Sequence, residues 1–252
     1  MSSDYGTPED RYSDISAIYD DLYDFTAETE ETVSFLAKLA SGGRVLELGV
    51  GTGRVALPLA ERGCDVTGVD ASPDMLRMLR TKDPGRKVKA LRSDMTAPEV
   101  DGEFDVIYAV WNSFCELHTQ ERQVACVASA ARLLRDGGSL VLETSVAHRA
   151  LTEQRPISVG PFTGLNAATF QLMRYDQLDQ IVEYRHVFLN ADGVKVMAST
   201  HRLVHLTELD LMARLGDLEL TARHGDWTGG PFHAASARHV SVYTKTGRAP
   251  SC

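Results

Sequence analysis

The chain has 252 residues, of which 43% are hydrophobic and 24% are charged, a composition typical of one α/β domain with an elaboration. Its net charge of −9, without a run of Lys or Arg, disfavours nucleic acid as the main partner and favours a small neutral or cationic molecule. The four cysteines form no C-x-x-C pair, so the spacing indicates neither a disulfide framework nor a metal site.

The sequence also lacks the patterns of a membrane span and of a secretory signal. No apolar run approaches the roughly 18 residues of a membrane span, and the first residues, Met-Ser-Ser-Asp-Tyr, lack the charged and apolar regions of a signal peptide. The expectation is a cytoplasmic protein without a membrane partner.

The first 42 residues are expected to form lid helices. Tyr12, Ile15, Tyr19 and Tyr23 recur at three- and four-residue spacing, as on one face of a helix. The spacing is equally consistent with two roles for these side chains: packing on the core and direct contact with a ligand. A second amphipathic helix is expected over 29–39, ended by Ser-Gly-Gly.

Strand and helix patterns then alternate through residues 43–144. Ser72 is a suitable N-cap with Pro73 at the first helical position, and Thr119 is suited to cap a later helix. This alternation predicts a parallel sheet with helices between its strands. The predicted strands are 44–49, 65–70, 87–92, 104–110 and 139–144, and the predicted helices are 54–62, 73–82 and 120 to about 134.

The most informative segment follows the first strand. Gly49, Gly51 and Gly53 interrupt an apolar run before a helical pattern begins, and glycines let a ligand approach main-chain N–H groups. Asp70 ends the second strand about 20 residues further on, where an acid can bind ribose hydroxyls. Together these features predict an adenosine-containing ligand, whereas a purely structural glycine turn gives no reason for the acid.

The third glycine distinguishes between adenosine ligands. The dinucleotide pattern G-x-G-x-x-G requires glycine at position 54, which is Arg54 here. The segment Leu-Glu-Leu-Gly-Val-Gly-Thr-Gly, with Glu47 before the glycines, closely resembles class I S-adenosylmethionine methyltransferases. A site with Glu47, Asp70 and Asp94 also suits a sulfonium cation better than a pyrophosphate.

The pattern changes from about residue 145 to residue 204, where polar and apolar residues alternate. Residues 190–193, Asn-Ala-Asp-Gly, predict a hairpin turn within an antiparallel β insertion. This insertion is interpreted as a substrate cover or a homo-oligomer contact. A helix over 208–215 and strands at 217–224 and 239–243 complete the chain.

The resemblance to the methyltransferases spans about residues 10–245. It implies a Rossmann-like, seven-stranded sheet, mostly parallel with an antiparallel last strand, formed by residues 43–144 and 205–246 and carrying the 145–204 insertion after strand five. The second half resembles the small-molecule group that includes amino-sugar N,N-dimethyltransferases of antibiotic pathways. This resemblance implies S-adenosylmethionine as cofactor and a small amine as acceptor.

The resemblance also implies roles for cofactor-binding residues. It places Asp70 at the ribose, Asp94 at the adenine amino group, and Tyr19 at the methionine carboxylate or in the substrate pocket, although Asp94 also fits a turn aspartate. The end of the fourth strand faces the crevice where ligands of open α/β sheets bind. The remaining expected contacts are Glu47, Gly49, Gly51 and Gly53 around the methionyl and ribose parts, Ala71, Met75 and Met95 at adenine, and Trp111 and Asn112 at the fourth strand.

A protonated amine has no lone pair, so a base assists where the neutral fraction is small. His118, Glu116 and Tyr12 are the candidate bases, and Phe114 is expected to line the acceptor pocket. His118 is interpreted at least as well as a solvent-exposed histidine beside the start of the helix that Thr119 caps, without a role as a base. Two late aromatics fit either an aromatic wall around a cationic nitrogen or core packing: Trp227 and Phe232.

Three functions remain open at this point: a small-molecule N-methyltransferase, an O- or C-methyltransferase on the same scaffold, and a non-catalytic S-adenosylmethionine-binding protein. The glycines, Asp70 and Asp94 argue against the third. The fourth strand is followed by Trp-Asn-Ser-Phe and not by the D/N-P-P-[YF] tetrapeptide of nucleic-acid base methyltransferases. Nitrogen of a small amine is therefore the favoured acceptor.

Overall fold

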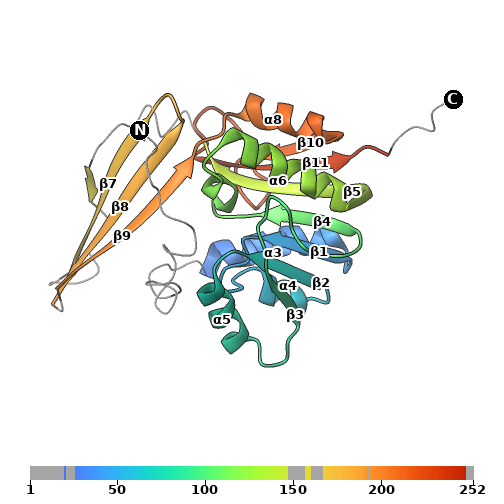
Figure 1. Cartoon of the computed structure of the whole chain (residues 1–252), viewed down its shortest axis with the longest axis horizontal. Coiled ribbons are helices and arrows are strands. Elements are labelled where there is room, and N and C mark those ends of the chain that lie inside the picture. The colour runs from blue at the N-terminus through green and yellow to red at the C-terminus, as the bar shows by residue number, and fades with distance from the viewer. Residues whose placement is uncertain (1–19, 21–25, 147–156, 160–166, 192, 248–252) are drawn as a thin grey trace.

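The alternating strands and helices build a seven-stranded sheet in the order β10-β11-β5-β4-β1-β2-β3 (Figure 1). The computed structural model describes residues 20, 26–146, 157–159, 167–191 and 193–247. The first five strands run parallel, and β11 pairs antiparallel with both β5 and β10. The predicted fold is confirmed. The strands are β1 (Arg44–Leu48), β2 (Asp65–Asp70), β3 (Val88–Arg92), β4 (Phe104–Ala109), β5 (Leu134–Ser145), β10 (Leu218–His224) and β11 (Arg238–Lys245).

Helices cover both faces of this sheet, which explains why its strands are apolar on both sides. Val45 packs in the core cluster with α3 and α4, whereas Leu46 and Leu48 pack in the cluster with α6 and α8. Within the described ranges, no helix combines the length and apolarity that a membrane crossing requires. The helices are α3 (Thr26–Ala40), α4 (Ala56–Glu61), α5 (Pro73–Lys82), α6 (Gln120–Leu133), α8 (Leu206–Leu215) and the short 3₁₀ helix η2 (Ser113–Glu116).

Capping side chains set the helix starts that the sequence predicts. Ser72 Oγ accepts from the Met75 N–H at 3.3 Å, and Thr119 Oγ1 accepts from the Arg122 N–H at 3.3 Å. These bonds confirm the predicted starts of α5 and α6. The helix after the glycine loop begins later than predicted, at Ala56, because residues 54 and 55 form a turn without a capping side chain.

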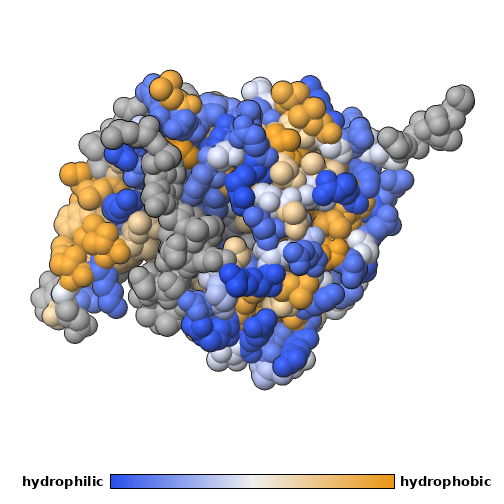
Figure 2. Space-filling model, in the orientation of Figure 1, coloured by the Kyte–Doolittle hydropathy of each residue, from blue (hydrophilic) through white to orange (hydrophobic). Residues whose placement is uncertain are grey.

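The insertion forms a separate antiparallel sheet of β6 (Ile157–Val159), β7 (Ala168–Asp176), β8 (Ile181–Asn190) and β9 (Gly193–Arg202). Asn190 pairs with Gly193, which confirms the predicted hairpin turn. This sheet extends from one side of the seven-stranded core (Figure 1). Figure 2 shows hydrophobic residues on the surface of this part of the molecule. Val194 and Val196 of β9 are about 60% exposed. The expected homo-oligomer contact stays a prediction.

Candidate active site

The glycine loop, residues 49–53, follows β1. Gly49, Gly51 and Gly53 have φ values of 79°, 53° and 84°, a region that glycine adopts at little cost. A Cβ on Gly49 would lie 2.9 Å from Ser113 Cβ, whereas a Cβ on Gly51 would meet nothing within 4 Å. Packing therefore requires glycine at position 49, and Gly51 borders open space that a ligand can fill.

Asp70 joins the end of β2 to this loop. Its Oδ2 accepts from the Gly51 N–H and its Oδ1 accepts from the Ser72 N–H, each at 2.8 Å. Burial raises the pKa of Asp70; the Ser72 and Gly51 N–H groups oppose this rise, and the charge of Glu116 adds to it. The acid and the loop that the sequence singled out thus form one hydrogen-bonded unit. Contact of Asp70 with ribose stays a prediction.

Glu47 lies beneath the loop on β1, beside Tyr108 of β4. The Tyr108 hydroxyl donates to Glu47 Oε2 at 2.9 Å, and the Glu47 side chain is buried. Burial raises the pKa of Glu47 to about 8, opposed by the Tyr108 hydrogen bond and by the charge of Arg54. A cationic ligand nearby would favour the ionised form of Glu47.

The residues predicted to surround adenine follow β2 and β3. Asp94 accepts from the Thr96 N–H and hydroxyl at 2.8 Å and pairs with Arg122 at 2.8 Å, so it is a turn aspartate in this structure. Partial burial opposes its ionisation, but the bonds from Thr96 and Arg122 lower the pKa of Asp94. Met95 Cε lies 3.6 Å from the position of a Cβ on Gly49. The predicted contacts of Asp94, Met95, Ala71 and Met75 with adenine stay predictions.

Two consecutive residues after β4 adopt left-handed backbone. Trp111 has φ 54° and Asn112 has φ 61°, a conformation that non-glycine residues hold only where the surroundings enforce it. The Trp111 N–H donates to Glu143 Oε2 at 2.8 Å, and Asn112 Oδ1 accepts from the Ser145 N–H at 2.7 Å. These bonds fix both residues in place after β4.

A cavity of about 300 Å³ lies between the glycine loop, the end of β4 with η2, and one face of the four-stranded sheet. We call that face of β7, β8 and β9 the inner face. The cavity is thus lined by both sheets. The core contributes Glu47, Gly49, Gly51, Trp111, Asn112 and Glu116, and the inner face contributes Gln171, Tyr184, His186, Met197, Ser199 and His201.

Two predicted substrate contacts, Phe114 and His118, do not line this cavity. Phe114 is fully buried in the core, because residues three apart share a face of a 3₁₀ helix and that face of η2 carries Ser113 and Glu116. His118 Nε2 lies 2.9 Å from the Thr200 carbonyl oxygen, to which it donates. In this structure Phe114 is a core residue and His118 links the start of α6 to β9, and the predicted substrate contacts of both residues stay predictions.

The late aromatics follow the packing alternative. Trp227 is 3% exposed and contacts Phe35 edge-on, with ring centroids 5.5 Å apart. Phe232 contacts His239 in the same way at 6.2 Å. Neither belongs to the cavity lining formed by the described residues.

The predicted lid with Tyr12 and Tyr19 lies outside the described residues. Asp20 is described, and its carboxylate accepts from Thr52 Oγ1 and from Lys82 Nζ, each at 2.7 Å. Asp20 is therefore bonded directly to the glycine loop.

Sequence reasoning singled out Glu116 but missed its neighbours on the inner face. His201 Nε2 lies 3.2 Å from Glu116 Oε1, and the Tyr184 ring centroid is 5.9 Å from that of His201. Strand alternation puts Tyr184 and His186 on one face, and the hairpin turn fixes Ser199 opposite Tyr184. This pattern was readable from the sequence, but the direction in which the face points was not.

Comparisons with known proteins agree with this geometry. A family model described as a methyltransferase domain matches residues 45–138. The chain is 33% identical over 207 residues to the cypemycin N-terminal methyltransferase of a Streptomyces species, covering 80% of this chain and 82% of the relative. It is similar to the solved CcbJ methyltransferase of Streptomyces caelestis, with 32% identity, a TM-score of 0.88 and coverage of 94% and 98% of the two chains.

A more distant solved structure shows the same fold with cofactor bound. It is CalS10, an amino pentose methyltransferase of Micromonospora echinaspora, with 20% identity, a TM-score of 0.68 and coverage of 92% and 95%. The open space at Gly51 belongs to a cavity that Glu47 and Glu116 also line, which fits a cationic cofactor of this kind. From the likeness over four fifths of the cypemycin enzyme and of this chain, we conclude that the chain belongs to the S-adenosylmethionine-dependent methyltransferases.

Proposed function

We propose that this methyltransferase transfers the methyl group of S-adenosylmethionine to the amine nitrogen of a small molecule in antibiotic or other secondary-metabolite biosynthesis. The observation that carries the proposal is the cavity shared by the glycine loop and the inner face, which is lined by the carboxyl groups of Glu47 and Glu116. The guanidinium of Arg54 also lines it, but donates to Thr29 Oγ1 at 3.0 Å and lies over the Trp111 ring. Such a lining favours a cationic acceptor.

The cofactor supplies a methyl group already activated by its sulfonium sulfur, so the protein mainly positions reactants and excludes water. Asp70, bonded to Gly51, keeps the glycine loop in place for the cofactor. The inner face covers the side of the cavity opposite the loop. We assign cofactor binding to residues 43–144 and 205–246 and acceptor binding to the insertion at 145–204.

Two further points support nitrogen over oxygen or carbon. The cypemycin relative is named for an N-terminus, which is an amine. An amine in its ammonium form is also a cation, and the carboxylate of Glu116 attracts it, whereas a neutral alcohol gains no such attraction.

Mass spectrometry with matched acceptors tests the proposal. Alaninamide and glucosamine are incubated with the protein and S-adenosylmethionine, beside lactamide and glucose, in which oxygen replaces the nitrogen. We expect a gain of one methyl group on the amines only. The Gly51→Val variant serves as the inactive control, because its side chain fills the open space at the loop and strains a backbone with φ 53°. Methylation of the oxygen compounds alone would overturn the assignment to nitrogen.

A further inference from the structure

Glu116 and His201 lie next to each other at the boundary between the two sheets. Glu116 is the last residue of η2, the short helix that follows β4, and His201 lies near the end of β9. His201 Nε2 is 3.2 Å from Glu116 Oε1, and the side chains are only 19% and 10% exposed. Both residues line the cavity. An imidazole therefore lies next to a carboxyl group in the lining of the space where the proposed acceptor binds.

We propose that His201, oriented by Glu116, is the base that removes the proton from the bound acceptor ammonium. The inference rests on the proposed function and deepens it by naming the group that frees the nitrogen lone pair. His201 Nε2 lies 3.2 Å from Glu116 Oε1, so the tautomer with its proton on Nε2 leaves the lone pair of Nδ1 available as a proton acceptor. Glu116 is the positioning residue of the pair.

The proton balance of the step is simple. The N–H bond of the ammonium breaks, an N–H bond forms at His201 Nδ1, and the resulting imidazolium is stabilised by the Glu116 carboxylate. The freed amine lone pair takes the methyl carbon as its bond to the cofactor sulfur breaks. The imidazolium then returns its proton to water, so each turnover releases one proton.

The groups around His201 suit this role. In the described part of the chain, Tyr184 and His186 of β8 face it from the neighbouring strand, and Glu116 faces it from η2. Burial lowers the pKa of His186, and the charge of His201 lowers it further, so one positive charge on the inner face disfavours a second. The negative charge of Glu116 also raises the pKa of Asp70, so the pair interacts electrostatically with the residue that holds the glycine loop.

The packing of β9 holds the pair in place. His118 Nε2 donates to the carbonyl of Thr200, the residue before His201, at 2.9 Å. His118 therefore positions the strand without lining the cavity, which makes it a useful comparison for a structural effect. His205 is exposed and makes no capping bond at the start of α8, which makes it a neutral control.

The pH dependence of the rate provides the test, with alaninamide and glucosamine as acceptors. An α-amine with a pKa of about 7.7–8.0 is only about one tenth neutral at pH 7, so His201→Gln should lower kcat/KM roughly 10-fold there. Above about pH 9 the loss should shrink to within about 2-fold, since most of the amine is then neutral without a base. Calorimetry should show unchanged S-adenosylmethionine affinity.

Three further variants separate proton transfer from structure. Glu116→Gln keeps a hydrogen-bond acceptor without the charge and should show an intermediate loss with the same pH trend. His118→Gln should lower the rate equally at all pH values, and His205→Gln should leave it unchanged. A parental rate and pH profile for His201→Gln on a methylated amine would overturn the role of His201 while leaving the proposed function intact.

A second measurement does not require turnover. ¹⁵N chemical shifts of the histidine rings in the complex with S-adenosylhomocysteine report which nitrogen of neutral His201 carries the proton. We expect Nε2–H in the parent and loss of this preference in Glu116→Ala. A proton on Nδ1 in the parent would remove the proposed acceptor site for any acceptor. Methylation of oxygen alone, with Nε2–H retained, would instead count against the proposed function.

Discussion

Asp70 offers the most direct test at the residue scale. Its carboxylate holds the Gly51 N–H and is predicted to accept from ribose hydroxyls, and charge-assisted hydrogen bonds contribute about 1.5–3 kcal/mol each. Asp70→Ala should therefore weaken S-adenosylmethionine binding roughly 10- to 100-fold, measured by calorimetry. Asp65→Ala, at the exposed start of the same strand, should bind like the parent. Unchanged affinity in a folded Asp70→Ala protein contradicts the assignment.

Glu47 should make stability depend on pH. Its pKa is about 8 in the folded protein, against an ordinary value of 4.5, so the folded state binds the extra proton between these values. The resulting stabilisation is fully present below about pH 4.5 and is lost as the pH rises through about 8. Thermal unfolding of parent and Glu47→Gln should show the parent losing stability relative to the variant from pH 5 to 8. A constant difference in Tm across this range would rule out the raised pKa.

At the scale of elements, the end of β4 is held by Asn112. Asn112→Ala places alanine in left-handed backbone, at a cost of about 1–2 kcal/mol, and removes the acceptor of the Ser145 N–H. We expect this variant to lose about 2 kcal/mol of unfolding free energy. Asn112→Gly removes the same acceptor without the steric cost, so it should be about 1 kcal/mol more stable than Asn112→Ala. Urea denaturation measures both, and the reverse order would show that the backbone conformation carries no cost.

Element boundaries also show what local chemistry predicts. The predicted ranges for β2, at 65–70, and α5, at 73–82, agree with the structure because Ser72 and Pro73 form a start signal within a few residues. β5 begins earlier than predicted, at Leu134, and its pairing with β4 is irregular between Phe104 and Val106. A neighbouring strand, and not the local glycines, decides where β5 begins.

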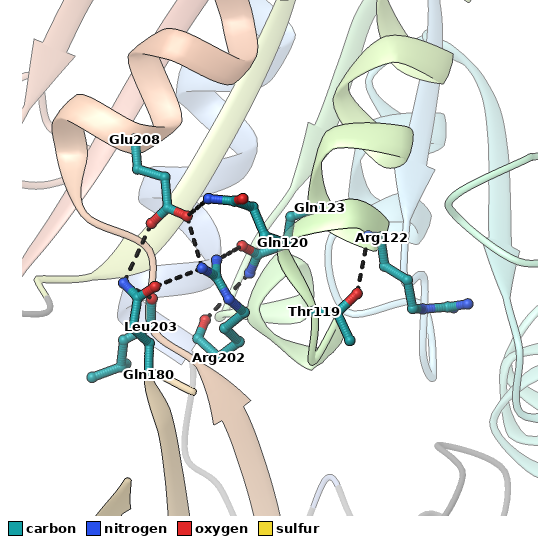
Figure 3. Close-up of polar contacts among 8 residues, drawn as sticks. All are labelled: Thr119, Gln120, Arg122, Gln123, Gln180, Arg202, Leu203 and Glu208. Atoms are coloured by element: carbon teal, nitrogen blue, oxygen red, sulfur yellow. Dashed lines mark hydrogen bonds and ion pairs between the residues drawn. The ribbon is translucent and has the colours of Figure 1, made fainter. Parts of the chain in front are cut away.

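At the scale of the molecule, Arg202 ties the second sheet to the core (Figure 3). From the end of β9 its guanidinium donates to Gln123 of α6, to Glu208 of α8 at 2.7 Å and to Gln180 at 2.6 Å. The Arg202 side chain is 6% exposed. This network fixes the strand that carries His201 against two helices of the core.

Breaking the network should loosen this attachment. Arg202→Met leaves the Glu208 carboxylate without its cation and should cost about 3–5 kcal/mol of unfolding free energy. Arg202→Met with Glu208→Leu should recover much of that loss, because a buried ion pair can be replaced by apolar side chains at little cost. Urea denaturation measures the cycle. Equal unfolding free energies of Arg202→Met and the double variant would show that the Glu208 carboxylate does not destabilise the fold when its cation is removed.

Sequence patterns alone were enough to predict the fold class and the cofactor, S-adenosylmethionine. Both are encoded locally: Gly49, Gly51 and Gly53 impose a loop of positive φ, and Asp70 ends the next strand. Parallel neighbours in one sheet bring such strand ends together, and in the structure the Gly51 N–H donates to Asp70.

The residues that the second sheet contributes to the cavity could not be identified without the tertiary structure. The sequence placed Phe114 and His118 near the substrate because they follow β4, but η2 turns Phe114 into the core and Glu116 into the cavity. His201 reaches Glu116 through the packing of the second sheet on the first, a contact between segments far apart in the chain. Strand alternation predicts which residues share a face of the second sheet. Which face meets the core depends on long-range contacts, such as the bond from Arg202 to Glu208, and these cannot be read from a local pattern.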